Sequence, residues 1–282
     1  MLPNLFSVYE RLLLIRPYTI PSILALGAFA HIFMNNAIIP NLLLLDLISL
    51  VGAWGSLIYV VEYSHKLTDG RGHTPIIYPF VFFMIFVLTA IIRQPLTLIT
   101  YIFMLVATII YSLKARNAVF GPFLFIFRGL VDVGLFLTII LFYTTNLSWN
   151  LLWPISAIYL ISVSRNLIGD VRDMRCVEFT FPRKFGAIWS YVVSFVLLAA
   201  ATITNQHILV NLPLFVILLL ILIRIQPYLL HKLFVVSTAA FFINFSADLL
   251  SESLILTNIL YLSAFFIFTY DCVPRKTNNF WQ

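Results

Sequence analysis

The sequence predicts an all-α protein, a polytopic bundle of transmembrane helices. Of its 282 residues, 62% are hydrophobic and 10% are charged, whereas charged residues make up about a quarter of a soluble domain. Apolar runs close to the ~20 residues that span a bilayer recur along the whole length. We therefore expect one transmembrane domain over residues 1–282.

Ten apolar runs are interpreted as spans. They lie near residues 17–37, 42–62, 76–92, 96–113, 122–143, 151–169, 187–203, 208–225, 229–249 and 254–271. The start, "MLPNLFSVYERLLLIRP", has no small-residue cleavage site, so the first span is expected to remain in the mature protein. Cys176 and Cys272 lie far apart and match no metal-ligand spacing, and we expect two free thiols.

The basic residues predict the orientation. With the N-terminus inside, the outer segments hold one basic residue, Arg93, together with Asp46, Asp248 and Glu252. The inner segments hold the following basic residues: Arg11, Arg16, Lys66, Arg71, Lys114, Arg116, Arg172, Arg175, Arg183, Lys184, Arg224, Lys232, Arg275 and Lys276. This positive-inside bias accounts for the net charge of +6 through topology and contact with anionic lipid, so no nucleic-acid partner is expected.

Two long polar connections, residues 63–75 and 170–186, lie on the inner side and are expected to form the mouth of a site. Near the second connection, Asn166, Asp170 and Asp173 follow helical spacing and share one face. Carboxylates at membrane depth are costly and usually indicate a function.

The end of the second span repeats this pattern, because Glu62, His65 and Asp69 also share one helix face. Magnesium prefers a few carboxylates together with water and phosphate oxygens, and nearby basic residues bind the remaining phosphate charge. The two stripes therefore predict a diphosphate held at the membrane surface by Mg²⁺. The alternative is that acidic and basic residues at the helix ends simply pair with each other.

The motifs around these stripes resemble those of the UbiA superfamily of intramembrane prenyltransferases. "VEYSHKLTD", from Val61 to Asp69, keeps the spacing of that family's first motif, Asn-Asp-x-x-Asp-x-x-x-Asp, although Val61 and His65 depart from its residue types. "RNLIGDVRDMRCVEFTFPRKFG" resembles the second motif, with Asp170 and Asp173 at its carboxylates. "RPYT" and "YSLKAR" resemble the family's opening Arg-Pro and its Tyr-Ser-x-x-Lys segment.

The resemblance implies an all-helical bundle around a central cavity open to lipid. The family usually has nine helices and the apolar runs here number ten, so nine to ten transmembrane helices are expected. It also implies Mg²⁺ as cofactor, an isoprenyl diphosphate as donor substrate and a membrane-soluble acceptor. The donor would ionise toward an allylic cation, which the acceptor attacks. The active site would face the cytoplasm.

The same resemblance suggests roles for individual residues. Glu62, Asp69, Asp170 and Asp173 are the expected metal ligands. His65 is either a diphosphate contact or a base, or else an interfacial histidine without a role. The expected substrate-binding residues are Arg16, Lys66, Tyr111, Lys114, Arg116, Asn166 and Arg172. Arg128 and Asp132 stand four residues apart on the fifth span, either as a structural pair or as substrate contacts. The last third of the chain is expected to supply only apolar helices.

Four functions remain open. Transfer of a prenyl group to a membrane-soluble acceptor is favoured by the two acidic stripes and the order of the motifs. A terpene cyclase of the same type and a non-catalytic isoprenoid-binding homologue are favoured by the altered first motif. A transporter is the weakest, because no inverted repeat is visible.

Overall fold

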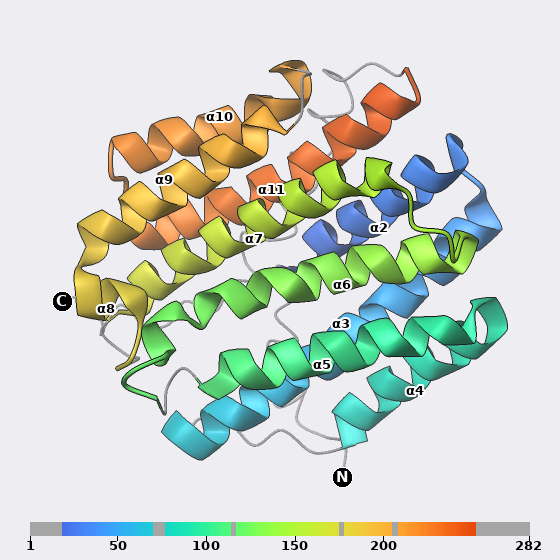
Figure 1. Ribbon diagram of the computed structural model, residues 1–282, viewed down its shortest axis with the longest axis horizontal. Helices are drawn as coiled ribbons and strands as arrows, with labels where there is room; N and C mark the ends of the chain where they lie inside the picture. Colours follow the sequence, from blue (N-terminus) through green and yellow to red (C-terminus); the bar gives the residue numbers. More distant parts are fainter. Residues whose placement is uncertain (1–18, 70–76, 114–116, 175–177, 205–207, 252–282) are drawn as a thin grey trace, which may run out of the picture.

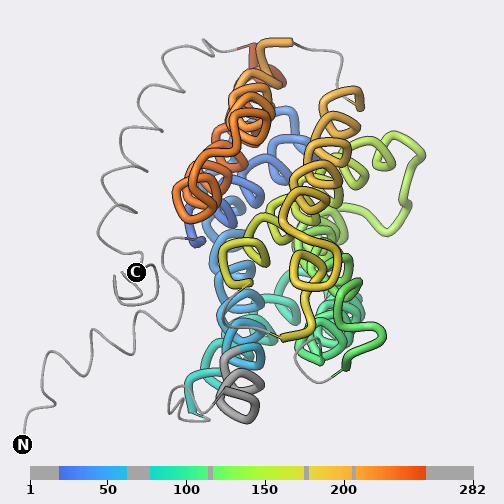
Figure 2. The backbone as a smooth tube through the Cα atoms, turned by 90° about the vertical axis from the view of Figure 1, so that its left-hand side faces the viewer, coloured from blue at the N-terminus to red at the C-terminus, as the bar shows by residue number. Residues whose placement is uncertain are grey.

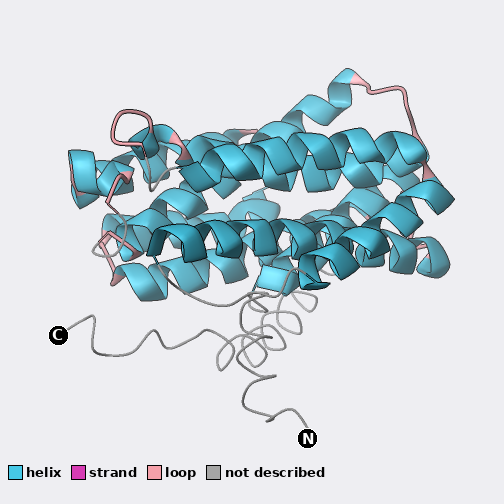
Figure 3. Cartoon of the chain, turned by 90° about the horizontal axis from the view of Figure 1, so that it is seen from below, coloured by secondary structure: helices cyan, strands magenta, loops and turns pink. Residues whose placement is uncertain are grey.

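The computed structural model describes residues 19–69, 77–113, 117–174, 178–204 and 208–251, with the backbone alone for residues 62–69. Every regular element in these ranges is helical (Figures 1 and 3). The long helices are α2 (Ile20–Asn35), α3 (Pro40–Asp69), α4 (Ile77–Arg93), α5 (Leu98–Ser112), α6 (Phe125–Tyr143), α7 (Leu152–Arg172), α9 (Ala187–Ile203), α10 (Ile208–Leu222) and α11 (Pro227–Leu249). Nine predicted spans are thus confirmed as helices, and the tenth, 254–271, lies outside the described residues.

Two helices extend beyond the predicted spans. α3 continues to Asp69, so the backbone of the first acidic stretch is helical and belongs to the last turns of α3. α7 continues to Arg172 and carries Asp170 in its last turn. The predicted 170–186 connection also contains a short helix, α8 (Phe181–Phe185).

The helix boundaries follow from local sequence. Asn36 adopts a left-handed conformation at φ 50°, and its N–H donates to the Ile32 carbonyl. This C-cap ends α2. Pro40 is the first residue of α3 and Pro227 is the first residue of α11, where proline is tolerated because the first N–H groups of a helix have no partner within it.

Five helical segments are long and apolar enough to cross a membrane. They are Pro40–Val61, Pro95–Ser112, Gly121–Tyr143, Trp149–Arg172 and Pro227–Leu249. Four shorter apolar helices, α2, α4, α9 and α10, pack beside them. The chain is an integral membrane protein.

The bundle has inner and outer helices. α2, α3, α6, α7 and α11 form the inner group, in which α2 contacts α3, α6 and α11, and α7 contacts α6 and α11. α4 and α5 flank this group beside α3 and α6, and α9 and α10 flank it beside α7 and α11 (Figures 1 and 2). The outer helices carry rows of exposed apolar residues, such as Phe80, Met84, Leu88 and Ile91 on α4. These rows are the surfaces that face lipid.

Glycine allows α3 and α4 to approach closely. A Cβ atom added at Gly52 would lie 2.8 Å from the backbone nitrogen of Phe86 and 3.0 Å from the carbonyl oxygen of Phe82. One turn further on, a Cβ at Gly55 would lie 2.5 Å from the Phe82 ring. Small residues at helix contacts are typical of membrane bundles, where van der Waals packing holds the helices together.

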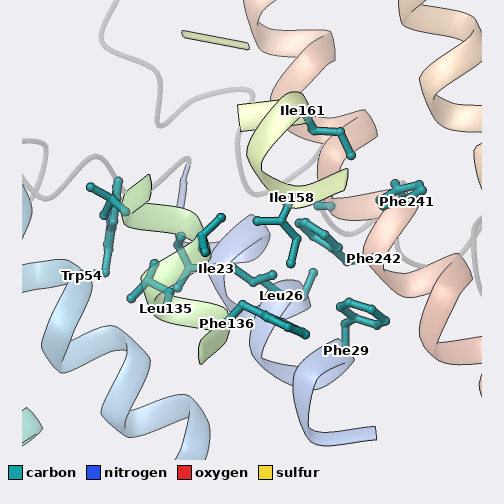
Figure 4. Packing of buried hydrophobic residues seen from close by; sticks show 14 of the residues in the cluster. Ile23, Leu26, Phe29, Trp54, Leu135, Phe136, Ile158, Ile161, Phe241 and Phe242 are labelled. Carbon is teal, nitrogen blue, oxygen red and sulfur yellow. The ribbon is translucent and has the colours of Figure 1, made fainter. Parts of the chain in front are cut away.

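The inner helices meet in an apolar core. Figure 4 shows Leu26 and Phe29 of α2 beside Phe136 of α6, Ile158 of α7 and Phe242 of α11, all of which are buried. The rings of Phe29 and Phe136 stack at 5.7 Å between centroids, and those of Phe29 and Phe242 at 5.9 Å. This core joins the helices of the first half of the chain to those of the second half.

We call the end of the bundle where α3 finishes at Asp69 and α7 finishes at Arg172 the motif end; it is on the left in Figure 1. The other end is the opposite end. There, Asp46 of α3 is fully buried and accepts hydrogen bonds from His31 Nδ1 of α2 at 2.8 Å and Tyr143 Oη of α6 at 2.6 Å. Arg93 of α4 lies 3.4 Å from the same carboxylate.

Backbone contacts fix the tautomer of His31 in this opposite-end cluster. The Ile39 N–H donates to His31 Nε2 at 3.1 Å, so Nε2 carries no proton and Nδ1–H is the donor to Asp46. The Arg93 guanidinium also lies 4.8 Å from the Tyr143 ring centroid. The cluster of His31, Asp46, Arg93 and Tyr143 therefore ties together α2, α3, α4 and α6.

Candidate functional site

The second acidic stripe lies at the end of α7, as predicted. Asp170 is 4% exposed, and Asp173 caps the helix through its N–H, which donates to the Gly169 carbonyl at 3.0 Å. Asp173 is more accessible, with a side chain 29% exposed. Consequently the two carboxylates differ in environment, one within the bundle and one at its surface.

Arg172 binds Asp173 through two hydrogen bonds. Its Nε donates to Oδ1 at 2.9 Å and its Nη2 donates to Oδ2 at 2.7 Å. This bidentate geometry matches a planar guanidinium to a carboxylate, and it would match two oxygens of a phosphate group equally well. The predicted substrate contact and the predicted metal ligand thus lie side by side.

A residue of α11 joins this pair. Arg172 Nη1 lies 3.1 Å from His231 Nδ1. The His231 ring lies against Gly169 of α7, where an added Cβ would be 3.3 Å from its Cδ2 and Nε2 atoms. The prediction that the last third supplies only apolar helices is therefore wrong at His231.

Two other predicted residues are described. The Asn166 amide donates to the Ser162 carbonyl one turn earlier at 2.9 Å, so its side chain lies along α7. Tyr111 is half-buried on α5, near the end of that helix. Their predicted roles with substrate stay predictions.

Arg165, one turn before Asp170 on α7, belongs to a buried ionic network with α6. Its Nη2 lies 2.6 Å from Asp132 Oδ2, and Ser162 Oγ donates to the same oxygen at 2.6 Å. The predicted pair of Arg128 and Asp132 is also present, at 3.6 Å. The Arg128 guanidinium in turn lies 4.4 Å from the ring centroid of Trp54 on α3.

This network links the helices that bear the two acidic stripes. α6 packs against both α3 and α7, so Arg128 and Asp132 connect one stripe-bearing helix to the other. Sequence spacing identified Arg128 with Asp132 but not the Arg165 contact, which depends on how α6 and α7 pack. The signal available in the sequence was that Arg128, Asp132 and Arg165 all lie inside predicted spans.

The remaining predicted residues fall outside the described side chains. Glu62, His65, Lys66 and Asp69 lie on the helical backbone at the end of α3. Arg16, Lys114 and Arg116 lie outside the described ranges. The helical backbone keeps Glu62, His65 and Asp69 on one face of α3, at the same end of the bundle as Asp170.

The donor set is suitable for magnesium. Asp170 and Asp173 stand three residues apart at the end of one helix and offer the carboxylate oxygens that this ion prefers. Among the described side chains there is no group of three His, Cys, Asp or Glu residues that would hold a metal. Further ligands would therefore come from the end of α3 or from a bound anion.

These features define a class of protein: a polytopic helical membrane protein with carboxylates at one end of the bundle and a buried ionic network next to them. Solved structures of a UbiA homologue from Archaeoglobus fulgidus have the same fold. One matches with a TM-score of 0.55 and 15% identity over 85% of this chain and 98% of that chain. The structure bound to GPP and Mg²⁺ matches with a TM-score of 0.57, 15% identity, 86% of this chain and 99% of that one.

A third structure of that homologue, bound to DMAPP and Mg²⁺, matches with a TM-score of 0.56 and 16% identity. No protein-family model and no curated protein matches the chain. The chain therefore has the fold of this UbiA homologue, which confirms, for the fold, the resemblance predicted from the motifs.

Proposed function

We propose that the chain is a divergent member of the UbiA superfamily that transfers a prenyl group from an isoprenyl diphosphate to a membrane-soluble acceptor. The observation that carries the proposal is the pair of carboxylates at the end of α7, Asp170 and Asp173, with Arg172 bound to Asp173. The fold is shared with a UbiA homologue that was solved with GPP and Mg²⁺. Carboxylates and a guanidinium together fit a metal-bound diphosphate better than either fits alone.

The acidic residues and the basic residues of the site have different roles in this proposal. Asp170 and Asp173, with Glu62 and Asp69 of α3, would hold Mg²⁺, which when bound stabilises negative charge on the leaving diphosphate. Arg172 would donate to the diphosphate oxygens. Further contacts would come from Arg16, Lys66, Lys114, Arg116, Tyr111, Asn166 and His65.

The test is Mg²⁺-dependent binding of a non-hydrolysable prenyl thiodiphosphate to the full chain in nanodiscs. Replacing both carboxylates, Asp170→Asn with Asp173→Asn, should weaken binding by at least about 10-fold, because even outer-shell changes at metal sites cost that much. Asp248→Asn, at the far end of α11, is the matched control and should bind as wild type. Equal affinity of the double variant and wild type would rule out this metal site.

Product analysis then separates the possible reactions. With an allylic diphosphate and an acceptor, prenylated acceptor is the expected product. Cyclic hydrocarbons or alcohols formed without any acceptor would contradict transfer and favour cyclisation.

We also propose that the motif end faces the cytoplasm. The described basic residues at that end include Arg172, Arg183, Lys184 and Lys232, whereas Arg93 lies at the opposite end. Basic residues favour the cytoplasmic side. In a chain with Cys176 and Cys272 replaced by serine, a membrane-impermeant thiol reagent should label Lys184→Cys in inside-out vesicles and not in intact cells; labelling in intact cells would reverse this orientation.

A further inference from the structure

We propose that His231 is a positioning residue that holds the Arg172 guanidinium in place for a diphosphate. This inference rests on the proposed function and extends it to α11, a helix that carries none of the predicted motifs. The juxtaposition that supports it is a single guanidinium with Asp173 on one edge and His231 at the other corner.

The contact geometry assigns different tasks to the two edges of Arg172. The Nε and Nη2 atoms form the edge that binds Asp173, at 2.9 and 2.7 Å, and this edge has the spacing that suits a pair of oxyanion oxygens. Nη1 lies outside that edge and meets His231 Nδ1 at 3.1 Å. His231 therefore engages the guanidinium without occupying its carboxylate-binding edge.

The hydrogen bond also fixes which ring nitrogen of His231 is protonated. A guanidinium N–H is always a donor, so Nδ1 must be the acceptor and the proton of the neutral ring lies on Nε2. An apolar side chain at position 231 would remove this acceptor and leave the two hydrogen bonds from Arg172 to Asp173 in place.

Packing holds the His231 ring in position. α7 and α11 are neighbours along the inner bundle, and Gly169 lies directly beneath the ring. A side chain at position 169 would crowd Cδ2 and Nε2, because an added Cβ would lie 3.3 Å from each atom. The ring thus lies close to Gly169 and is hydrogen-bonded to Arg172.

A rigidly held arginine favours anion binding because less conformational freedom is lost when the ligand arrives. Long side chains lose substantial rotamer entropy when they are immobilised. Arg172, held in advance by His231, presents its Nε–Nη2 edge at the end of α7 whether that edge binds Asp173 or the oxygens of a diphosphate.

The experiment measures affinity for a prenyl thiodiphosphate with Mg²⁺ in nanodiscs. His231→Phe keeps a ring against Gly169 and loses the acceptor, and it should bind about 10-fold more weakly than wild type. His231→Asn offers a side-chain oxygen near the position of Nδ1 and should recover most of the affinity. His231→Leu is a second variant without an acceptor and should behave as His231→Phe.

A double-mutant cycle separates positioning from general damage. In the Arg172→Gln background, His231→Phe should cause little further loss, because the group that it positions is already absent. Steady-state kinetics should show the single variant's defect mainly in KM for the diphosphate. The thermal midpoint of each variant reports whether the bundle is intact.

The outcomes distinguish this inference from the function on which it rests. If wild type binds the analogue and His231→Phe binds it equally well, or if the two losses simply add, the positioning role is overturned and the proposed function stands. If wild type shows no Mg²⁺-dependent binding, the proposed function fails and His231 has no diphosphate to serve.

Discussion

Replacing Asp132 with leucine is expected to lower the free energy of unfolding by about 3–5 kcal/mol, the cost of leaving a buried charge without its partner. Asp132 is 5% exposed and Arg165 is 8% exposed, and their closest atoms are 2.6 Å apart. Without the carboxylate, the Arg165 guanidinium would remain between α6 and α7 in a medium of low dielectric constant, where an unpaired charge is costly. The measurement is unfolding in detergent, followed by circular dichroism.

A second substitution tests this cause. Adding Arg165→Met to Asp132→Leu should recover part of the lost stability, because the double variant removes the guanidinium that lay 2.6 Å from the carboxylate, while Arg128 keeps its contact with the Trp54 ring. Arg183→Gln, an exposed charge on α8, is the control and should change stability little. If Arg165→Met makes the Asp132→Leu protein still less stable, the ion pair is not the source of the effect.

Asp46→Ala is expected to destabilise the opposite end by a similar amount, about 3–5 kcal/mol, for a related reason. The carboxylate accepts from His31 and Tyr143 and lies beside Arg93, so its removal leaves two donors and a cation facing each other. Tyr143→Phe removes the hydroxyl that donates to Asp46 and lies 2.8 Å from His31 Nδ1, and it should cost about 1–3 kcal/mol. The midpoint of thermal unfolding should therefore be lower for Asp46→Ala than for Tyr143→Phe.

The Asp46 substitution should lower stability without weakening substrate binding. Asp46 precedes Glu62 by 16 residues on α3, which corresponds to about 24 Å along a helix. Asp46→Ala protein that is still folded should then bind a prenyl thiodiphosphate with Mg²⁺ as wild type does. Weaker binding by a folded variant would mean that the two ends of the bundle are coupled.

The helices were predictable because hydrophobic length is a local property of the sequence. Eight spans fell within about three residues of the observed helices, while the second ended before the last seven residues of α3. The i, i+4, i+7 pattern placed Asp170 in the last turn of α7, with Asp173 at the C-cap of that helix. Asn244 and Ser246 make the ninth predicted span less apolar, yet α11 is continuous. The Asn244 amide donates to the Leu209 carbonyl of α10, and Ser246 Oγ donates to the Phe242 carbonyl, so both polar groups are satisfied within the bundle.

The pairs between helices were not predictable from spacing. Arg165 and Asp132 lie on different helices, and so do His231 and Arg172, so their contacts depend on helix rotation and register. His31 carries no local signal because one histidine in an apolar helix is usually a packing residue. Only the predicted topology contained a hint, since it placed Asp46 and Arg93 at the same edge of the membrane, where the structure joins them.

The short outer helices have a consequence for the surrounding bilayer. α9 has 17 residues and α10 has 15, so they measure about 26 Å and about 22 Å along their axes. A typical hydrocarbon layer is ~30 Å thick, and a shorter apolar surface is accommodated by local thinning of the lipid. Acyl chains beside α9 and α10 must therefore compress, as must those beside α4, which also has 17 residues, and this hydrophobic mismatch favours residence in thinner membranes.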